Sequence, residues 1–180
     1  GGLYQWGRAA DGHESTTSGT TSTTSATDAP GHGDFIITSE DWRTTQNDNL
    51  WQGANGTNNP CPTGYRLPTQ AEFTGLGITN TASAYSSSLK LPLAGYRDNS
   101  NGSLNVVGTF GYYWLSTVSG TSARFIYYRY NYAKLGTDNR AFGFSARCIK
   151  GLSPAEDASI AVLANLSAAT TVADLNTITP

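Results

Sequence analysis

Six of the chain's ten tyrosines lie between Tyr112 and Tyr132, and four of them crowd into the run FIYYRYNY at 125–132. In an extended strand, successive side chains point to opposite faces. A strand over 125–130 would carry Ile126, Tyr128 and Tyr130 on one face, and Phe125, Tyr127 and Arg129 on the other. Both faces are bulky, so at least one of them must be covered by other atoms.

Two arrangements satisfy this constraint. The strand is either buried between two layers of the protein, or it presents one aromatic face to a partner. Tyrosine is seldom fully buried and is frequent at interfaces, because it offers rigid contact area and a polar tip. We therefore predict a recognition surface, to which Tyr112 and Tyr113 also contribute. Arg129, among phenols, fits either cation–π packing or recognition of an acidic group of a ligand.

The charge of the chain argues against two classes of partner. The formal net charge is −2 and charged residues make up 13% of the sequence, about half the usual share. Nucleic acids and anionic membranes both select basic surfaces, so we expect neither as a partner. No run approaches the roughly 18–20 apolar residues of a membrane span, which predicts no membrane insertion. The start lacks a signal-peptide pattern, which predicts a mature fragment or another export route.

Two cysteines, Cys61 and Cys148, are present. In an oxidising compartment they would close a long loop and contribute about 4–5 kcal/mol in the chain-entropy model. The alternative is two buried thiols that never meet, and the sequence alone does not decide between them. A polar, uncharged composition rich in Gly, Ser, Thr, Asn and Tyr is common in extracellular and virion-surface proteins, and the disulfide is favoured.

The N-terminal half predicts short elements between long loops. We expect an edge strand at 3–8 and a Ser/Thr-rich surface loop at 15–27. Residues 35–37 are expected to form a short apolar strand or to pack as an apolar plug under that loop. Thr69 followed by Glu72 forms a capping box, which predicts a helix over about 70–76 with Phe73 and Leu76 facing inward.

From Leu89 onward the pattern is that of β-structure. Leucines alternate with other residues at 89–93, and Asn101-Gly102 predicts a hairpin turn. Strands are expected at 104–109, 111–117 and 123–130, then a polar loop at 133–142 and a last strand at 144–149. Residues 1–150 are predicted to form one domain.

The tail differs in composition. A second capping box at 153–156, with proline at the first helical position, predicts a helix over about 154–166. This Ala-rich segment, residues 151–180, is predicted to be a helical appendage, an oligomerisation stalk or a linker to a following domain.

Other candidate sites carry weaker signals. The tryptophans at 6, 42, 51 and 114 are expected in the core more often than stacked on sugars. His13, Glu14, His32 and Asp34 lack a fixed ligand spacing, so we interpret them as solvated loop residues and not as a metal site. A calcium site at 98–101 is less plausible than a turn. No nucleophile elbow or placed carboxylate pair is present, so we predict no catalytic residue, no metal and no cofactor.

Five motifs carry a family resemblance: YQWGR at 4–8, NPCPTGYRLPT at 59–69, LPLAGYR at 91–97, GYYW at 111–114 and GFSARCIK at 143–150. In this order they resemble the Fibrobacter succinogenes major paralogous domain over about residues 3–150. That family is similar to C-type lectins. The resemblance therefore implies an α+β fold with a twisted antiparallel sheet, short helices, long irregular loops and one disulfide, Cys61–Cys148.

The resemblance also implies a place for the ligand. In some members the segment before the final Arg-Cys resembles the hypervariable region of diversity-generating retroelement targets, which bind receptors. Positions matching that segment, together with the tyrosine cluster, give the predicted ligand-binding residues Tyr112, Tyr113, Leu115, Phe125, Tyr127, Arg129, Tyr130, Tyr132, Lys134, Gly136, Thr137, Asp138 and Phe142.

These observations predict a non-enzymatic binding domain on a bacterial surface or a phage tail fibre, with a cell-surface protein or glycan as its receptor. The alternative is a structural fibre subunit whose aromatic face docks a neighbouring subunit, with a homo-oligomer formed through the C-terminal segment. A glycan-degrading enzyme is the third and weakest hypothesis.

Overall fold

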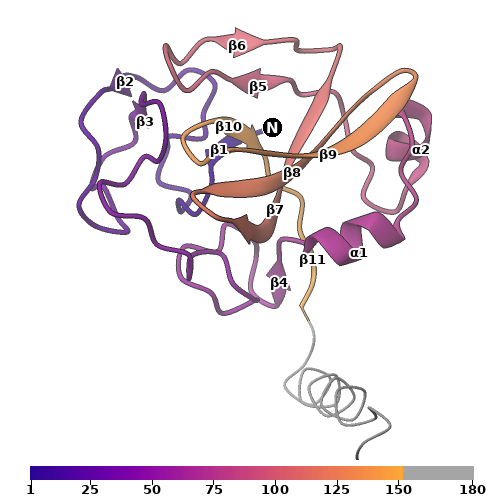
Figure 1. Cartoon of the computed structure of the whole chain (residues 1–180), viewed down its shortest axis with the longest axis horizontal. Coiled ribbons are helices and arrows are strands. Elements are labelled where there is room, and N and C mark those ends of the chain that lie inside the picture. The colour runs from indigo at the N-terminus through magenta and orange to yellow at the C-terminus, as the bar shows by residue number, and fades with distance from the viewer. Residues whose placement is uncertain (152–180) are drawn as a thin grey trace, which may run out of the picture. The chain divides into compact units, whose positions relative to one another are not determined.

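The structure is a computed structural model, and it describes residues 1–151 (Figure 1). Contacts within the chain group Gly1–Lys150 into one compact unit. The helix predicted over about 154–166, and with it the appendage or stalk, lies outside the described residues. No helix among residues 1–151 is long and apolar enough to cross a membrane.

A seven-stranded sheet dominates the described part of the chain. Its order is β6-β5-β10-β7-β8-β9, and β1 pairs with β10. The strands are β1 (Leu3–Gln5), β5 (Tyr96–Arg97), β6 (Leu104–Asn105), β7 (Gly111–Ser119), β8 (Ser122–Arg129), β9 (Tyr132–Asn139) and β10 (Gly143–Ser145). The prediction of an antiparallel sheet is wrong at one place, because β10 runs parallel to β7 through the pair Ser145 and Tyr113.

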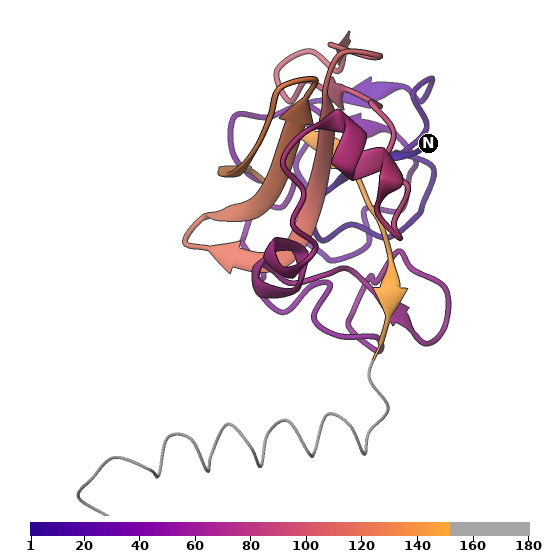
Figure 2. The same ribbon diagram turned by 90° about the vertical axis from the view of Figure 1, so that its right-hand side faces the viewer.

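The remaining elements are short. The strands β2 (Thr20–Thr21) and β3 (Phe35–Ile36) form a parallel pair, and β4 (Tyr65–Arg66) pairs antiparallel with β11 (Ile149–Lys150). Two helices are present among the described residues, α1 (Gln70–Gly75) and α2 (Thr81–Ser86). Figure 2, seen from the side of these helices, shows both of them in front of the long strands. Mostly sheet with two short helices, the described part is compatible with the α+β class.

The predicted turn at Asn101-Gly102 is present, whereas two stretches expected to be β-structure are shortened or absent. The hairpin predicted at Asn101-Gly102 joins β5 to β6, with Arg97 opposite Leu104. The expected strand at 104–109 ends early, because Val106 adopts a φ of 49° and its carbonyl accepts the N–H groups of Thr109 and Phe110 in a turn. The alternating leucines at 89–93 form no strand, since Lys90 also has a positive φ of 49°.

The polar loop predicted at 133–142 is wrong. Residues 132–139 form strand β9, paired with β8 along its whole length. A strand at the edge of a sheet tolerates charged and polar side chains, and they protect its open edge from further pairing. The polar pattern of this segment is therefore that of an edge strand.

Both helices begin with a capping box. At α1 the predicted reciprocal bonds between Thr69 and Glu72 are present, and Phe73 is buried as expected. Leu76, predicted to face inward, is 37% exposed, because α1 ends at Gly75 and Leu76 is already the C-cap. The helix α2, which was not predicted, is capped by Asn80 and Ser83 in the same way.

The tryptophans form the centre of the first hydrophobic core, as predicted. All four are fully buried, and each indole N–H donates a hydrogen bond to a backbone carbonyl. Trp6 donates to Leu115 and Trp42 donates to Trp6. Trp51 donates to Arg8 and Trp114 donates to Tyr4. This cluster also contains Phe125 and Phe144 of the sheet. A second cluster packs Phe73 of α1 and Ala84 of α2 against the other side of β7 and β8.

Buried arginines hold the long loops in place. Arg8 donates to Asp11, to Gln5 and to the carbonyls of His32 and Asp34. Arg97 donates to Ser18 and to the carbonyls of Ser15 and Gly102, while its guanidinium lies 4.3 Å from the centre of the Phe35 ring. Because these bonds satisfy buried carbonyls of loops far apart in sequence, they fix irregular backbone that no strand ladder supports.

The disulfide between Cys61 and Cys148 is present, with 5.8 Å between the two Cα atoms. It lies next to the β4–β11 pair, in which Ile149 opposes Arg66. The disulfide therefore ties the end of the domain to the loop that precedes α1.

Candidate ligand-binding face

Strand register brings most of the predicted binding residues to one face of the sheet. Residues directly opposite each other in an antiparallel pair have side chains on the same face. Tyr127 of β8 opposes Tyr112 of β7 and Lys134 of β9. Continuing this register gives a set that we call the tyrosine face: Tyr112, Phe125, Tyr127, Arg129, Tyr132, Lys134, Gly136 and Asp138.

One part of this face is covered and the other is open. Phe125 is 6% exposed and packs in the tryptophan cluster. Tyr112, Tyr127, Arg129 and Tyr132 are half-buried, and Lys134 is exposed. The strand β8 thus lies between two core clusters over part of its length, and toward Arg129 its aromatic face reaches the surface.

The open part is a packed array of rings. Tyr112 and Tyr127 stack with their centroids 5.8 Å apart and their planes at 13°. Tyr132 meets the ring of Tyr127 edge-on at 5.9 Å. Because each ring is held by its neighbours on a strand, the array offers contact area with little side-chain entropy left to lose on binding.

Two cations lie at the same end of the face. The Arg129 guanidinium lies 4.9 Å from the ring centre of Tyr130, 5.4 Å from that of Tyr132 and 5.5 Å from that of Phe110. The Lys134 Nζ lies 5.3 Å from the ring centre of Tyr132. Nε of Arg129 is buried, and no group among residues 1–151 forms a hydrogen bond with it. This end of the face thus carries positive charge. Arg129 makes the cation–π contacts that were one of the two roles expected for it from the sequence.

A small hollow opens beside the tyrosine face. It has a volume of about 120 Å³ and is lined by Tyr96, Tyr112, Asp138, Phe142 and Phe144. Burial, followed by the neighbouring phenols and Asp138, raises the pKa of Tyr112 to about 12, so its hydroxyl stays protonated. Burial also raises the pKa of Asp138, although the N–H of Asn139 donates to its carboxylate and partly offsets this.

Five predicted residues lie off the tyrosine face. Tyr113 and Leu115 belong to the second core cluster, with 3% and 0% exposure, so they support the sheet from behind. Thr137 is exposed. It opposes Arg124, so its side chain lies on the side of the sheet opposite to the tyrosine face. Tyr130 is 73% exposed in the turn between β8 and β9, and Phe142 lines the hollow.

Three aromatic residues that contribute to this region were not predicted. Tyr96 and Phe144 line the hollow, and Phe110 lies under Arg129. Tyr96 lies on β5 and Phe144 on β10. These strands come next to β7 because strands that are distant in sequence pair in the sheet. The Tyr96-Arg97 and Gly143-Phe144 pairs were visible as parts of motifs, but nothing in their local pattern placed them next to Tyr112.

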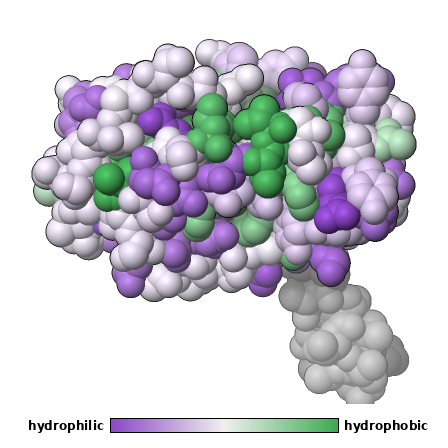
Figure 3. Space-filling view, turned by 90° about the horizontal axis from the view of Figure 1, so that it is seen from above, coloured by the Kyte–Doolittle hydropathy of each residue, from purple (hydrophilic) through white to green (hydrophobic). Residues whose placement is uncertain are grey.

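Apolar side chains extend beyond the rings. Leu104, Val106 and Val107 are 44%, 39% and 58% exposed, in β6 and in the turn that leads to Phe110. Figure 3 shows apolar side chains gathered on the face seen from above, the side on which β5 and β6 lie in Figure 1. Val106 is β-branched and has a positive φ, a conformation that is strained for such a residue and is frequent at binding sites.

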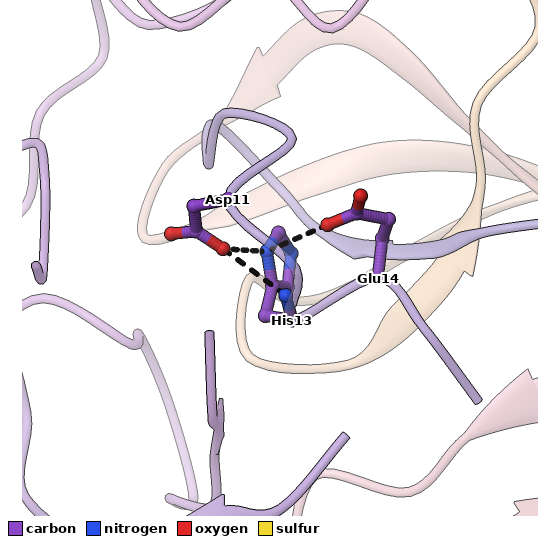
Figure 4. Close-up of side chains that lie close together, drawn as sticks. All are labelled: Asp11, His13 and Glu14. Atoms are coloured by element: carbon purple, nitrogen blue, oxygen red, sulfur yellow. Dashed lines mark hydrogen bonds and ion pairs between the residues drawn. The ribbon is translucent and has the colours of Figure 1, made fainter. Parts of the chain in front are cut away.

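Among the described residues, one group could be considered for a metal ion: Asp11, His13 and Glu14 (Figure 4). The Nε2 of His13 accepts the N–H of Gln5, so its proton lies on Nδ1, which is 2.7 Å from Asp11 Oδ1 and 3.6 Å from Glu14 Oε2. His13 is fully buried, so its prediction as a solvated loop residue is wrong.

These contacts leave no free ligand set. Asp11 also accepts from Arg8 at 2.8 Å. Burial raises the pKa of Asp11, but the bonds from His13 and Arg8 outweigh this and bring it to about 2. A cation here would have to displace the Nδ1 proton and lie beside a guanidinium, so the group is better explained as a hydrogen-bonded brace between loops.

No family model, no curated protein and no solved structure matches this chain. The resemblance to the Fibrobacter domain therefore stays a prediction. What bears on function is the tyrosine face, with the hollow and the exposed apolar turn beside it.

Proposed function

We propose that residues 1–150 form a binding domain and that the tyrosine face recognises a receptor on a cell surface. The single observation that carries this proposal is the shared register of Tyr112, Tyr127 and Tyr132, which presents a stacked, half-exposed aromatic array on three neighbouring strands. Clustered tyrosines with an arginine among them are the composition of binding hot spots.

The scaffold suits this role. Strands, a disulfide and buried arginines fix the positions of the rings, so little conformational freedom is lost when a partner binds. A disulfide persists in oxidising surroundings, which supports an extracellular place for the domain, on a bacterial surface or a phage tail fibre. Short helices, long loops and the disulfide also fit the proposal of a C-type-lectin-like fold.

The positions proposed to vary among relatives fall into two groups. Tyr127, Tyr130, Tyr132 and Asp138 reach solvent, and of these Tyr127 also packs against the first core cluster. Leu115 is fully buried, so we leave it out of the proposed binding set. A near-copy of the 112–148 coding segment beside a reverse-transcriptase gene would support diversification of this surface.

The test is binding of the labelled, full chain to a panel of intact bacterial cells. Replacing Tyr127, Tyr130 and Tyr132 together by Ala should abolish binding, while a cooperative thermal transition shows that the chain remains folded. Tyr65 and Tyr85 provide the matched control, because they are 44% and 67% exposed and lie outside the face. Their replacement by Ala should leave binding intact.

Pre-treatment of the cells separates the two classes of receptor: protease removes a protein receptor, and periodate destroys a glycan. Equal binding by the triple variant and the parent would refute the role of the face. An isolated chain that is an oligomer, with Tyr127 and Tyr132 shielded from chemical modification, would instead support a structural subunit of a fibre.

A further inference from the structure

We propose that the hollow beside the tyrosine face binds an ammonium or methylammonium group of the ligand, held by the rings of Tyr96, Tyr112, Phe142 and Phe144 and by the carboxylate of Asp138. This inference rests on the proposed binding function and names the chemistry of one part of the ligand. It is carried by the arrangement of the rings, by the isolation of the carboxylate and by the size of the hollow.

The ring of Tyr96 stands at a steep angle to its neighbours among the four rings that line the hollow. Tyr96 meets Tyr112 at 5.0 Å and 65°, and meets Phe142 at 5.8 Å and 74°. Phe144 lies 5.2 Å from Tyr112 at 38° and 5.6 Å from Phe142 at 25°. The hollow is therefore bordered by rings in two main orientations, and the negative faces of aromatic rings attract a cation placed against them.

Asp138 has no cationic partner of its own among the described residues. No ion pair forms to it there, and the hydrogen bond that its carboxylate accepts comes from the N–H of the next residue, Asn139. Lys134, on the same strand and the same face, is four residues away, or about 13 Å at the rise of a strand. A half-buried carboxylate without a counter-charge is costly, and a bound cation would relieve that cost.

The size of the hollow selects a small group. Its volume is about 120 Å³. A primary or methylated ammonium fits this space, whereas a sugar ring is too large to enter it whole. Such a group can come from a lysine of a receptor protein, from an amino sugar or from a quaternary head group, and all three share the chemistry that the hollow recognises.

The test compares choline with 3,3-dimethylbutan-1-ol, a neutral molecule of the same shape, by NMR titration of the full chain. We expect choline to shift the ring resonances of Tyr96 and Tyr112 with a Kd in the millimolar range, and the alcohol to bind at least tenfold more weakly. Nα-acetyl-lysine methylamide and glucosamine then show which source of ammonium fits best.

Two variants locate the site. Asp138→Asn keeps the shape of the side chain and should weaken choline binding at least tenfold. Tyr96→Leu removes one aromatic wall and should weaken it several-fold. The control Glu40→Gln removes the same charge from an exposed residue that does not line the hollow, and should leave choline binding unchanged.

Equal binding of choline and the alcohol, or unchanged choline binding in Asp138→Asn, would overturn the inference. The Tyr127, Tyr130 and Tyr132 triple variant should still bind choline, because none of these residues lines the hollow. A chain that binds choline but no cell therefore contradicts the proposed function alone. A chain that binds cells but not choline contradicts this inference alone.

Discussion

The ring of Phe125 lies across Gly136, its partner on the neighbouring strand. A Cβ atom at Gly136 would approach Phe125 Cζ to 2.6 Å and Cε1 to 2.8 Å, closer than side-chain carbons can pack. The glycine thus leaves room for a ring that reaches into the tryptophan cluster. The sizes of these two side chains are therefore coupled, although both positions were predicted simply as ligand-binding residues.

Gly136→Ala should lower the free energy of unfolding by about 1–3 kcal/mol, the usual cost of overpacking. Phe125→Ala should cost about 3–5 kcal/mol because it leaves a cavity. In the double variant the added methyl meets no ring, so the combined loss should fall short of the sum by about 1 kcal/mol or more. Urea unfolding measures all three values.

Gly75→Ala is the control for this cycle, because a Cβ at that position would meet no described atom within 4 Å outside its chain neighbours and its own helix backbone. Its effect should simply add to that of Phe125→Ala. Additivity at Gly136 as well would show that the ring moves aside freely.

Asp138→Asn should leave the chain as stable as the parent at pH 7, or make it more stable. Burial raises the pKa of this carboxyl above its ordinary 3.8, so the folded state holds the proton more tightly than the unfolded state does. The protonated carboxyl therefore contributes to the stability of the folded state fully below about pH 3.8, and this contribution is lost as the pH rises through the folded-state pKa. The advantage of the amide should therefore appear near neutral pH and vanish in acid.

Melting temperatures of the parent and of Asp138→Asn at pH 7 and pH 3 measure this difference. A variant clearly less stable than the parent at pH 7 would mean that the carboxylate has a stabilising partner in the folded chain. It would remove the reason to expect a cation from the ligand.

Local signals predicted local structure well. The Thr69 and Glu72 capping box, the Asn101-Gly102 turn and the alternation along β8 each depend on neighbours in sequence, and each is present. The same alternation correctly put Phe125, Tyr127 and Arg129 on one face. Strand β9 was missed because its polar pattern, typical of a loop, also suits an edge strand.

The extent of the binding face could not be read from the sequence. Which part of the aromatic strand is covered depends on Trp6, Trp51 and other residues of the N-terminal loops, more than a hundred positions away in one case. The hollow depends on the order in which β5, β10 and β7 join the sheet. Pairing of distant strands leaves no mark in the periodicity of any one of them.

Reduction of the Cys61–Cys148 disulfide should lower the free energy of unfolding by about 2–5 kcal/mol. The bond closes a loop that contains the helices and most of the sheet, so the reduced unfolded chain gains many conformations. Urea unfolding with and without reductant gives the difference, and Cys61→Ala with Cys148→Ala should show no further effect of reductant. A stability that reductant does not change in the parent would mean that the bond adds nothing to the fold.

Glu72→Gln should destabilise the chain above pH 4.5 and matter less and less as the solution becomes more acid. Hydrogen bonds from both Arg66 terminal nitrogens, at 2.8 and 2.6 Å, are the main cause that lowers the Glu72 pKa from 4.5 to about 2, and the N–H of Thr69 adds to it at 2.8 Å.

A lowered pKa means that the ionised group stabilises the folded state fully above the unfolded pKa and that this contribution is lost as the pH falls toward 2. Glu72 is partly exposed, so solvent screens the pair and we expect a loss of about 1 kcal/mol, the size of a helix cap. Urea unfolding of the parent and the variant at pH 7, 5 and 3 should therefore show a difference that shrinks in acid. The exposed control Glu40→Gln should show a small difference. A difference for Glu72→Gln that does not change with pH would mean that the loss does not come from the charge of the carboxylate.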